Sequence, residues 1–321
     1  MPNYGVIDLG SNSIRLVVYE VKEPASGAYT SKDFSSLISD KVMAGLSAFV
    51  EEGVFTPAGI DRAVEVLKGH AKRARYFRCE RLDVFATAVL RNCANSDDAV
   101  RAISKRIDEP ITLLSSRDEA HLGFVGATSY RPIDRGTVID IGGGSTEITR
   151  VRKGRDSDHT SVRMGSLSSF AQYVRGIPPT AEEMRCISDA LWDLVRDLPE
   201  ASGYRSERFF GIGGSIRAAA KMFAQMNSLT TRPKSLSRSD LETILDFARE
   251  NPDAFTHQAL KASTERVHTI VPGIVIMHRL MSELGGEEIE ICKYGVREGY
   301  LLERMLSPKR TSTTKKAKAT S

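Results

Sequence analysis

The amino-acid sequence predicts an α/β protein made of two similar halves with a cleft between them. Two hairpins, at residues 5–21 and 136–151, each contain an apolar strand with an aspartate near its end, a turn of small residues and a returning strand. Strands and helices alternate after each hairpin, and the length of 321 residues suits two domains. We therefore expect one domain at residues 1–132 and a second at 133–306, with the last helix packing back on the first domain.

In the first half, the hairpin is followed by alternating helical and strand patterns. Thr56 and Pro57 predict a helix start, because threonine caps helix N-termini and proline suits the first turn. Ser96 is expected to cap the next helix, which has two aspartates in its first turn. The elements expected after the hairpin lie at residues 56–77, 82–88, 96–107, 111–114 and 117–130.

The second half shows a similar alternation after its own hairpin. Helices are expected near residues 180–198, 215–226, 239–249 and 264–284, strands near 207–211 and 288–292, and a closing helix at 296–305. The tail at 307–321 is rich in lysine, serine and threonine, so we expect it to be disordered.

The charge of the chain is unevenly distributed. The formal net charge is +4, but the tail holds five basic residues and no acid, which leaves 40 basic and 41 acidic residues elsewhere. The folded part is therefore not expected to bind nucleic acid.

No apolar run approaches the ~20 residues of a membrane helix, and the N-terminus lacks a signal-peptide pattern. Four scattered cysteines indicate reduced thiols, as in a cytoplasmic protein. The sequence leaves open whether the chain forms a homodimer.

The strongest candidate site is the second hairpin turn, DIGGGSTE. Three consecutive glycines let backbone N–H groups approach phosphate oxygens, and a serine adds a hydroxyl donor. The flanking carboxylates suit Mg²⁺ or another divalent cation. The alternative is a plain glycine-rich hairpin with solvated acids; the carboxylates and the similar first hairpin favour the site. The assigned residues are Asp140 and Glu147 for the metal and Gly142, Gly143, Gly144 and Ser145 for phosphate.

The first hairpin turn, DLGSNS, is the second candidate. Asp8 is expected to face the metal or its water shell, while Ser11, Asn12 and Ser13 offer hydrogen-bond donors to phosphate. A tight turn that uses these side chains for local hydrogen bonds explains this segment equally well. Its pairing with the second hairpin is what favours a role in binding.

A third glycine cluster, GIGGSIRAAAK at residues 211–221, follows an apolar strand and begins a helix. Gly213 and Gly214 would leave free N–H groups at the helix N-terminus near an anion. Close packing of strand against helix would also require glycine, and the sequence leaves both interpretations open.

Seven segments, taken in order, resemble motifs of the exopolyphosphatase and guanosine pentaphosphate phosphohydrolase (Ppx/GppA) family. The resemblance covers residues 4–306, and it implies the duplicated actin-like, ribonuclease H-like fold of the sugar kinase, heat-shock 70 and actin superfamily. The chain resembles the short family members that lack an added helical domain. The matching segments are residues 5–21, 85–95, 116–124, 140–147, 211–219, 265–273 and 294–301.

The resemblance also implies roles for four further residues. Glu119 would be the general base that activates water, and Arg91 would contact phosphate, with Arg15 and Arg266 at further arginine positions of the family. From the residues alone, Glu119 also fits a capping box with Ser116 at the helix start. Similarly, each arginine can be read as a solvated surface charge.

The chain departs from the family pattern at residues 42–46, 89 and 292–293, none of which is a proposed metal carboxylate. The expected activity is removal of the terminal phosphate of inorganic polyphosphate with Mg²⁺. Guanosine pentaphosphate is the alternative substrate, since the motifs serve both. A superfamily kinase and a non-catalytic polyphosphate or nucleotide sensor are the alternatives of other classes.

Overall fold

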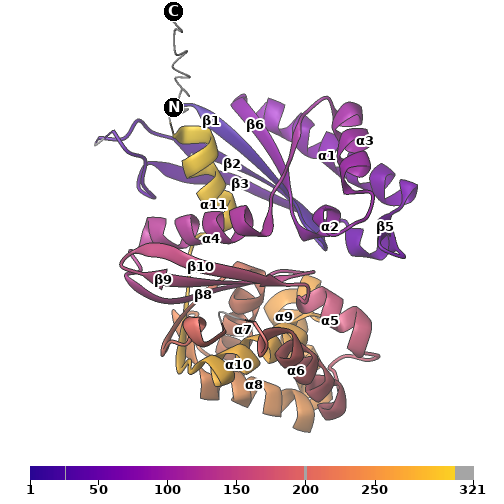
Figure 1. Cartoon of the computed structure of the whole chain (residues 1–321), viewed down its shortest axis with the longest axis vertical. Helices are drawn as coiled ribbons and strands as arrows, with labels where there is room; N and C mark the ends of the chain where they lie inside the picture. Colours follow the sequence, from indigo (N-terminus) through magenta and orange to yellow (C-terminus); the bar gives the residue numbers. More distant parts are fainter. Residues whose placement is uncertain (26, 199–200, 308–321) are drawn as a thin grey trace, which may run out of the picture.

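The computed structural model describes residues 1–25, 27–198 and 201–307 and contains two large mixed β-sheets (Figure 1). The first sheet has the strand order β3-β2-β1-β6-β7. β1, β2 and β3 are antiparallel neighbours, whereas β6 and β7 continue the sheet in parallel with β1. The strands are β1 Asn3–Leu9, β2 Ser13–Val21, β3 Phe34–Met43, β6 Cys79–Ala86 and β7 Ile111–Leu113.

Helices pack against the first sheet largely where the sequence predicts them. The side chain of Thr56 accepts a hydrogen bond from the N–H of Gly59, so the expected cap of α1 is confirmed. The expected cap at Ser96 is wrong, because α3 begins at that residue and Asn95 precedes it without a side-chain cap. The elements are η1 Leu46–Phe49, β4 Val50–Glu51, β5 Val54–Phe55, α1 Pro57–Tyr76, α2 Ala88–Arg91, α3 Ser96–Ile107 and α4 Ser116–Tyr130.

The second sheet has the order β10-β9-β8-β11-β13-β12, and its first five strands repeat the arrangement of the first sheet. In both sheets a meander of three antiparallel strands is followed by two parallel strands. The predicted internal duplication is therefore confirmed. The strands are β8 Arg135–Ile141, β9 Thr146–Arg152, β10 Arg155–Val162, β11 Arg208–Ile212, β12 Ser235–Ser237 and β13 Glu288–Ile291.

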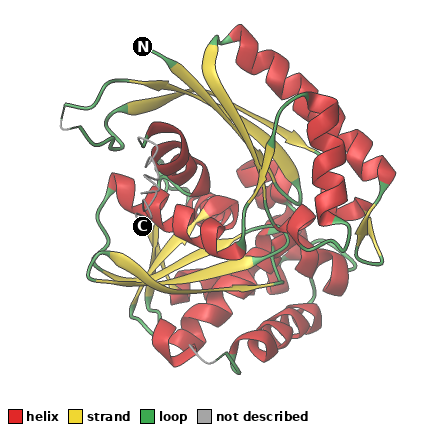
Figure 2. Cartoon of the chain, turned by 45° about the horizontal axis from the view of Figure 1, so that its top comes forward, coloured by secondary structure: helices red, strands yellow, loops and turns green. Residues whose placement is uncertain are grey.

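The helices of the second half enclose a large apolar core with this sheet. The single helix expected at 264–284 is wrong, because the short helix η3 ends at Arg266 and α10 begins only at Ile270. Figure 2 shows helices between the two sheets and beyond the second one. The helices are α5 Ser166–Tyr173, α6 Ala181–Val195, η2 Ala201–Tyr204, α7 Gly213–Met226, α8 Arg238–Glu250, α9 Pro252–Ser263, η3 Thr264–Arg266 and α10 Ile270–Leu284.

After the second sheet, the chain returns to the first one. α11 (Val296–Tyr300) continues into a π-helical segment, η4 (Leu301–Leu306). Leu301 and Met305 belong to the same buried cluster as Val6, Val17 and Phe85 of the first sheet (Figure 1). The tail expected to be disordered lies outside the described residues, apart from its first serine. No described helix is long and apolar enough to cross a membrane.

The two hairpins have the same backbone plan. Gly10 N–H donates to the carbonyl of Ser13 at 3.1 Å, and Gly142 N–H donates to that of Ser145 at 2.9 Å. Strand register places Asp8 opposite Arg15 in the first half. The equivalent register of the second half places Asp140 opposite a glutamate, Glu147. At this equivalent position of the two hairpins, the first half therefore has a basic residue and the second half has an acid.

Candidate functional site

The turns of the two hairpins meet at a cavity of about 670 Å³ between the halves. A Cβ atom on Gly144 would lie 2.9 Å from Ser11 Oγ, so the two turns touch there. The cavity is lined by every predicted site residue except Arg91. A second cavity of about 700 Å³, lined by residues such as Asp134 and Arg205, contains none of them. The sequence therefore identified residues that converge in space.

Two carboxylates lie side by side at the second hairpin. Glu147 is buried, and its Oε1 accepts hydrogen bonds from Ser145 Oγ at 2.7 Å and Ser161 Oγ at 2.8 Å. The Ser145 hydroxyl, expected to face phosphate, is thus engaged by Glu147. Burial raises the pKa of Asp140 to about 6, and burial together with Asp140 raises the pKa of Glu147 to about 7. A nearby cation would favour the charged form of both groups.

Asp140 and Glu147 fit a divalent cation through the chemistry of their donors. Among the described residues, no hydrogen bond or ion pair engages the Asp140 carboxylate, although burial disfavours its charge. Mg²⁺ is typically held by one or two carboxylates plus phosphate oxygens and water, which matches this pair. Within the same residues, no three His, Cys, Asp or Glu side chains converge as a metal-binding group. The expected third member, Asp8, is paired elsewhere.

Asp8 forms an ion pair with Arg297, whose Nη1 lies 2.7 Å from Asp8 Oδ2. Burial raises the pKa of Asp8, although Arg297 acts in the opposite direction. Arg297 was not assigned from the sequence, even though it lies in the matching segment 294–301. The signal was present in that segment, but Asp8 is 289 residues away in the chain.

Glu119 projects into the cavity from the first turn of α4. The alternative interpretation, a capping box between Ser116 and Glu119, is wrong, because the cap is Ser115, which accepts from Asp118 N–H at 3.0 Å. The Glu119 carboxylate instead accepts a hydrogen bond from Arg91 Nη1 at 2.5 Å. Burial, and then the negative charge of Glu147, raise the pKa of Glu119 well above its usual range.

Arg91 lies behind the two glutamates rather than in the cavity lining. Its Nη1 also donates to the carbonyl of Leu114 at 3.1 Å, and its Nη2 lies 3.8 Å from Glu147 Oε1. The guanidinium therefore holds Glu119 in place, and the phosphate contact expected of Arg91 stays a prediction. This pairing joins the end of α2 to the start of α4.

Three arginines line the cavity without an acidic partner among the described residues. Arg15 Nε donates only to a hydroxyl, that of Ser39, at 2.8 Å. Burial and the charge of Arg297 lower the pKa of Arg217, another residue not assigned from the sequence, to about 10. Burial likewise lowers the pKa of Arg266. Partly buried cations without counter-charges favour the binding of an anion.

The third glycine cluster serves close packing. Gly213 has a φ of +87°, and a Cβ atom there would lie 2.5 Å from Asp140 Oδ1. A Cβ atom on Gly214 would overlap the guanidinium of Arg266. Both glycines also line the cavity at the N-terminus of α7, so packing and anion binding remain compatible interpretations.

Comparisons with known proteins agree with this geometry. A model of the Ppx/GppA phosphatase family matches residues 7–308. Exopolyphosphatase 1 of Mycobacterium leprae is 26% identical over 313 residues, which cover 94% of this chain and 89% of the relative. The crystal structure of an exopolyphosphatase from Cytophaga hutchinsonii has a TM-score of 0.79 at 19% identity, covering 93% of this chain and 96% of that one. A nucleoside triphosphate hydrolase structure from Neospora caninum has a TM-score of 0.57 at 11% identity, covering 95% and 92%. The predicted actin-like fold is confirmed.

Proposed function

Because the chain belongs to the Ppx/GppA phosphatase family and hydrolyses phosphoanhydride bonds, we propose that it removes the terminal phosphate of inorganic polyphosphate. The observation that carries this proposal is the charge distribution in the cavity. Arg15, Arg217 and Arg266 provide uncompensated positive charge, while Asp140 and Glu147 form an acidic pair in the same space. A chain of phosphates with a metal ion at its terminal group complements both.

The hairpin turns supply the phosphate cradle of this proposal. The N–H groups of Gly143 and Gly144 donate no hydrogen bond within the described residues, and both glycines line the cavity. Free N–H groups that converge in a turn bind phosphate oxygens. Ser11, Asn12 and Ser13 face the same space from the other turn.

Asp140 and Glu147 are the residues that would hold Mg²⁺ or another divalent cation. The bound ion would neutralise charge on the phosphate oxygens. Ser145 and Ser161 both donate to Glu147 Oε1, and its other oxygen, which has no hydrogen-bond partner among the described residues, would be available to the ion. We expect metal-free enzyme, and Asp140→Ala with metal, to lose nearly all phosphate release. Full activity after chelation would contradict this assignment.

Glu119 acts as the general base in the proposed reaction. Its carboxylate takes a proton from water, the water oxygen bonds to the terminal phosphorus, and the bond from that phosphorus to the bridging oxygen breaks. A pKa raised by burial and by Glu147 makes Glu119 a stronger base than an exposed glutamate. The cavity arginines neutralise the oxyanion that leaves.

Guanosine pentaphosphate is a second candidate, which one feature of the cavity favours. Tyr294 lines it and packs against the buried Phe34, with ring centroids 5.3 Å apart. Aromatic side chains provide a surface on which a purine base stacks. The same machinery would then remove the 5′ γ-phosphate of the nucleotide.

The test is phosphate release from long polyphosphate, tripolyphosphate, guanosine pentaphosphate and ATP with Mg²⁺, compared for wild type and Glu119→Gln. We expect polyphosphate to have the highest kcat/KM, and Glu119→Gln to lower kcat by roughly 10²-fold or more with substrate affinity largely kept. A phosphorylated acceptor instead of free phosphate would indicate a kinase. Binding without turnover in the wild type would indicate a sensor.

A further inference from the structure

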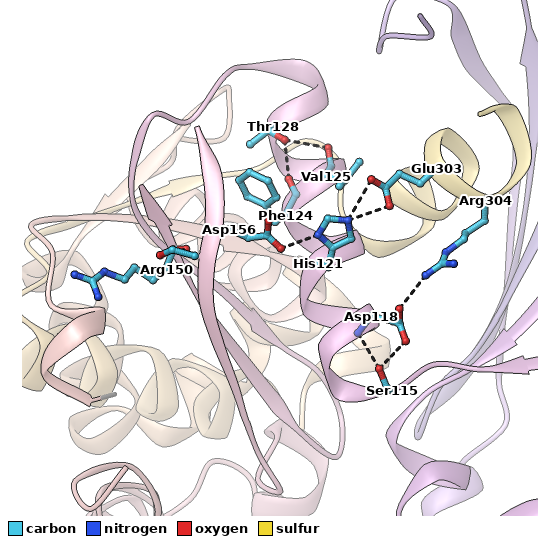
Figure 3. A network of polar contacts seen from close by, with 11 residues as sticks. Ser115, Asp118, His121, Phe124, Val125, Thr128, Arg150, Asp156, Glu303 and Arg304 are labelled. Carbon is cyan, nitrogen blue, oxygen red and sulfur yellow. Dashed lines mark hydrogen bonds and ion pairs between the residues drawn. The ribbon is translucent and has the colours of Figure 1, made fainter. Parts of the chain in front are cut away.

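A histidine outside the cavity connects three elements of the molecule. His121 follows Glu119 by two residues on α4 and is not among the residues lining the cavity. Its Nδ1 lies 2.6 Å from Asp156 Oδ2 on β10 (Figure 3). Its Nε2 lies 3.0 and 3.1 Å from the two carboxylate oxygens of Glu303 on η4.

This geometry defines the charge of the ring. Carboxylates only accept hydrogen bonds, and a neutral imidazole has a single N–H donor, so both contacts form only when the ring is an imidazolium. The hydrogen bond to Asp156, opposed by burial and supported by Glu303, raises the pKa of His121 to about 9. His121 is therefore a cation at neutral pH, held between two acids.

The two acids belong to different parts of the fold. β10 is the edge strand of the second sheet, whereas η4 packs against the first sheet through residues such as Leu301 and Met305. α4 lies between them and packs against β10 (Figure 1). The charged groups that form ion pairs on these elements and on the neighbouring strand β9 are Asp118 on α4, Asp156 and Asp158 on β10, Glu303 and Arg304 on η4, and Arg150 on β9.

The nearby arginines do not compete for the two acids. Arg304 Nη2 lies 2.8 Å from Asp118 Oδ1, and Arg150 Nη1 lies 3.4 Å from Asp158 Oδ2. The Arg304–Asp118 pair provides a second tie between η4 and the first turn of α4 (Figure 3). His121 is thus the cation that connects α4 to both neighbours.

We propose that His121 is a positioning residue for the reaction: its imidazolium joins β10 and η4 across α4 and fixes the helical turn that carries Glu119. This inference rests on the proposed role of Glu119 as the base. A slide or tilt of α4 would move the Glu119 carboxylate relative to Arg91 and Glu147. A displacement of about 1 Å costs on the order of 10²-fold in rate. Phosphate binding should change little, because the hairpin turns and arginines come from other elements.

The test compares His121→Gln and His121→Arg by steady-state phosphate release from polyphosphate with Mg²⁺. We expect His121→Gln to lower kcat about tenfold, a smaller effect than a full 1 Å displacement, with KM within about twofold. His121→Arg, a planar cation with several N–H donors, should recover most of kcat. The control is Arg131→Gln, which removes an ion pair with Glu290 (2.8 Å) at the other end of α4 and should leave kcat unchanged.

The pH profile separates positioning from a general loss of stability. Wild-type kcat should fall as pH rises through about 9, because a neutral ring keeps only one of its two contacts. The His121→Arg profile should lack this step, whereas titration of Arg217, with its pKa of about 10, would affect both enzymes. Wild-type kcat in His121→Gln, or the same alkaline step in His121→Arg, would overturn the proposal.

Two further variants keep the proposal testable if His121→Gln does not fold. Asp156→Asn and Glu303→Gln each remove one contact and should each lower kcat, and wild-type kcat in both would overturn the role. Glu119→Gln separates this inference from the proposed function. An active Glu119→Gln enzyme would refute the role of Glu119 as the general base. If Glu119→Gln is inactive while His121→Gln is fully active, only the positioning role of His121 is refuted.

Discussion

Gly126→Ala should destabilise the protein by separating two helices that cross in contact. A Cβ atom on Gly126 of α4 would overlap the carbonyl oxygen of Gly295, at the start of α11, and would lie 2.6 Å from its carbonyl carbon. Carbon atoms in contact ordinarily lie about 3.5–4.0 Å apart. The two backbones must therefore move apart by at least about 1 Å, because neither side has a flexible side chain that could rotate away.

The size of the effect follows from two opposing contributions. Alanine is about 1 kcal/mol more favourable than glycine inside a helix, whereas overpacking a close contact costs about 1–3 kcal/mol and occasionally more. Since backbone meets backbone here, the upper part of that range applies. We expect a net loss of about 2 kcal/mol in the free energy of unfolding, together with a lower kcat, because α4 also carries Glu119.

Gly69→Ala is the matched control for this substitution. Gly69 lies on the exposed side of α1, where an added Cβ atom would meet nothing within 4 Å. The same chemical change should there stabilise the protein by about 0.5–1 kcal/mol. Urea unfolding followed by circular dichroism, together with phosphate release, measures both variants. A Gly126→Ala protein as stable as the Gly69→Ala protein would refute the crossing argument.

Three further predictions concern charged groups. Arg91→Lys should lower kcat/KM by roughly 10- to 100-fold, since an ammonium cannot keep all contacts of the guanidinium and a hydrogen bond to a charged group contributes about 1.5–3 kcal/mol; wild-type kinetics would show that charge alone suffices. Glu265→Gln removes the acid that pairs with Lys41 across the cleft and leaves the charge of Lys41 without this partner. KM for long polyphosphate should therefore fall by at most about fivefold, and this effect must vanish at high salt. The raised pKa of His121 means that its ion pairs stabilise the fold fully below about pH 6.5 and less as pH rises through about 9. The stability difference between wild type and His121→Gln should therefore shrink over that range; a constant difference would contradict the assigned charge.

Local patterns predicted the two hairpins and most helices correctly. Strand periodicity, glycine turns and the Thr56 cap depend on residues close together in the sequence, so the chain itself reveals them. β3 was not predicted, because half of its segment FSSLISDKVM is polar and the apolar residues do not alternate regularly, as suits an edge strand with a partly exposed face. β10, with the segment RDSDHTSV, is almost wholly polar and was also missed.

The composition of the site was easier to predict than its contacts. Glycines and carboxylates in a turn indicate phosphate and metal chemistry wherever the turn lies. The pairing of Arg91 with Glu119, in contrast, depends on how α2 and α4 meet, and that of Asp8 with Arg297 on the return of the C-terminal helix to the first sheet. Sequence spacing contains no information about such tertiary contacts.

The close crossing of α4 and α11 also determines how the cleft can open. The backbone passes from the first half to the second after α4 and returns before α11, and the contact between Gly126 and Gly295 sets these two passages side by side. We expect them to act as a double-stranded hinge, about which the halves rotate without stretching the chain. Across the cleft, β3 meets η3 through the side chains of Lys41 and Glu265, an ion pair of the kind that costs little to break. We therefore expect a long polyphosphate chain to enter the cleft from its open side, instead of threading its end through a closed channel.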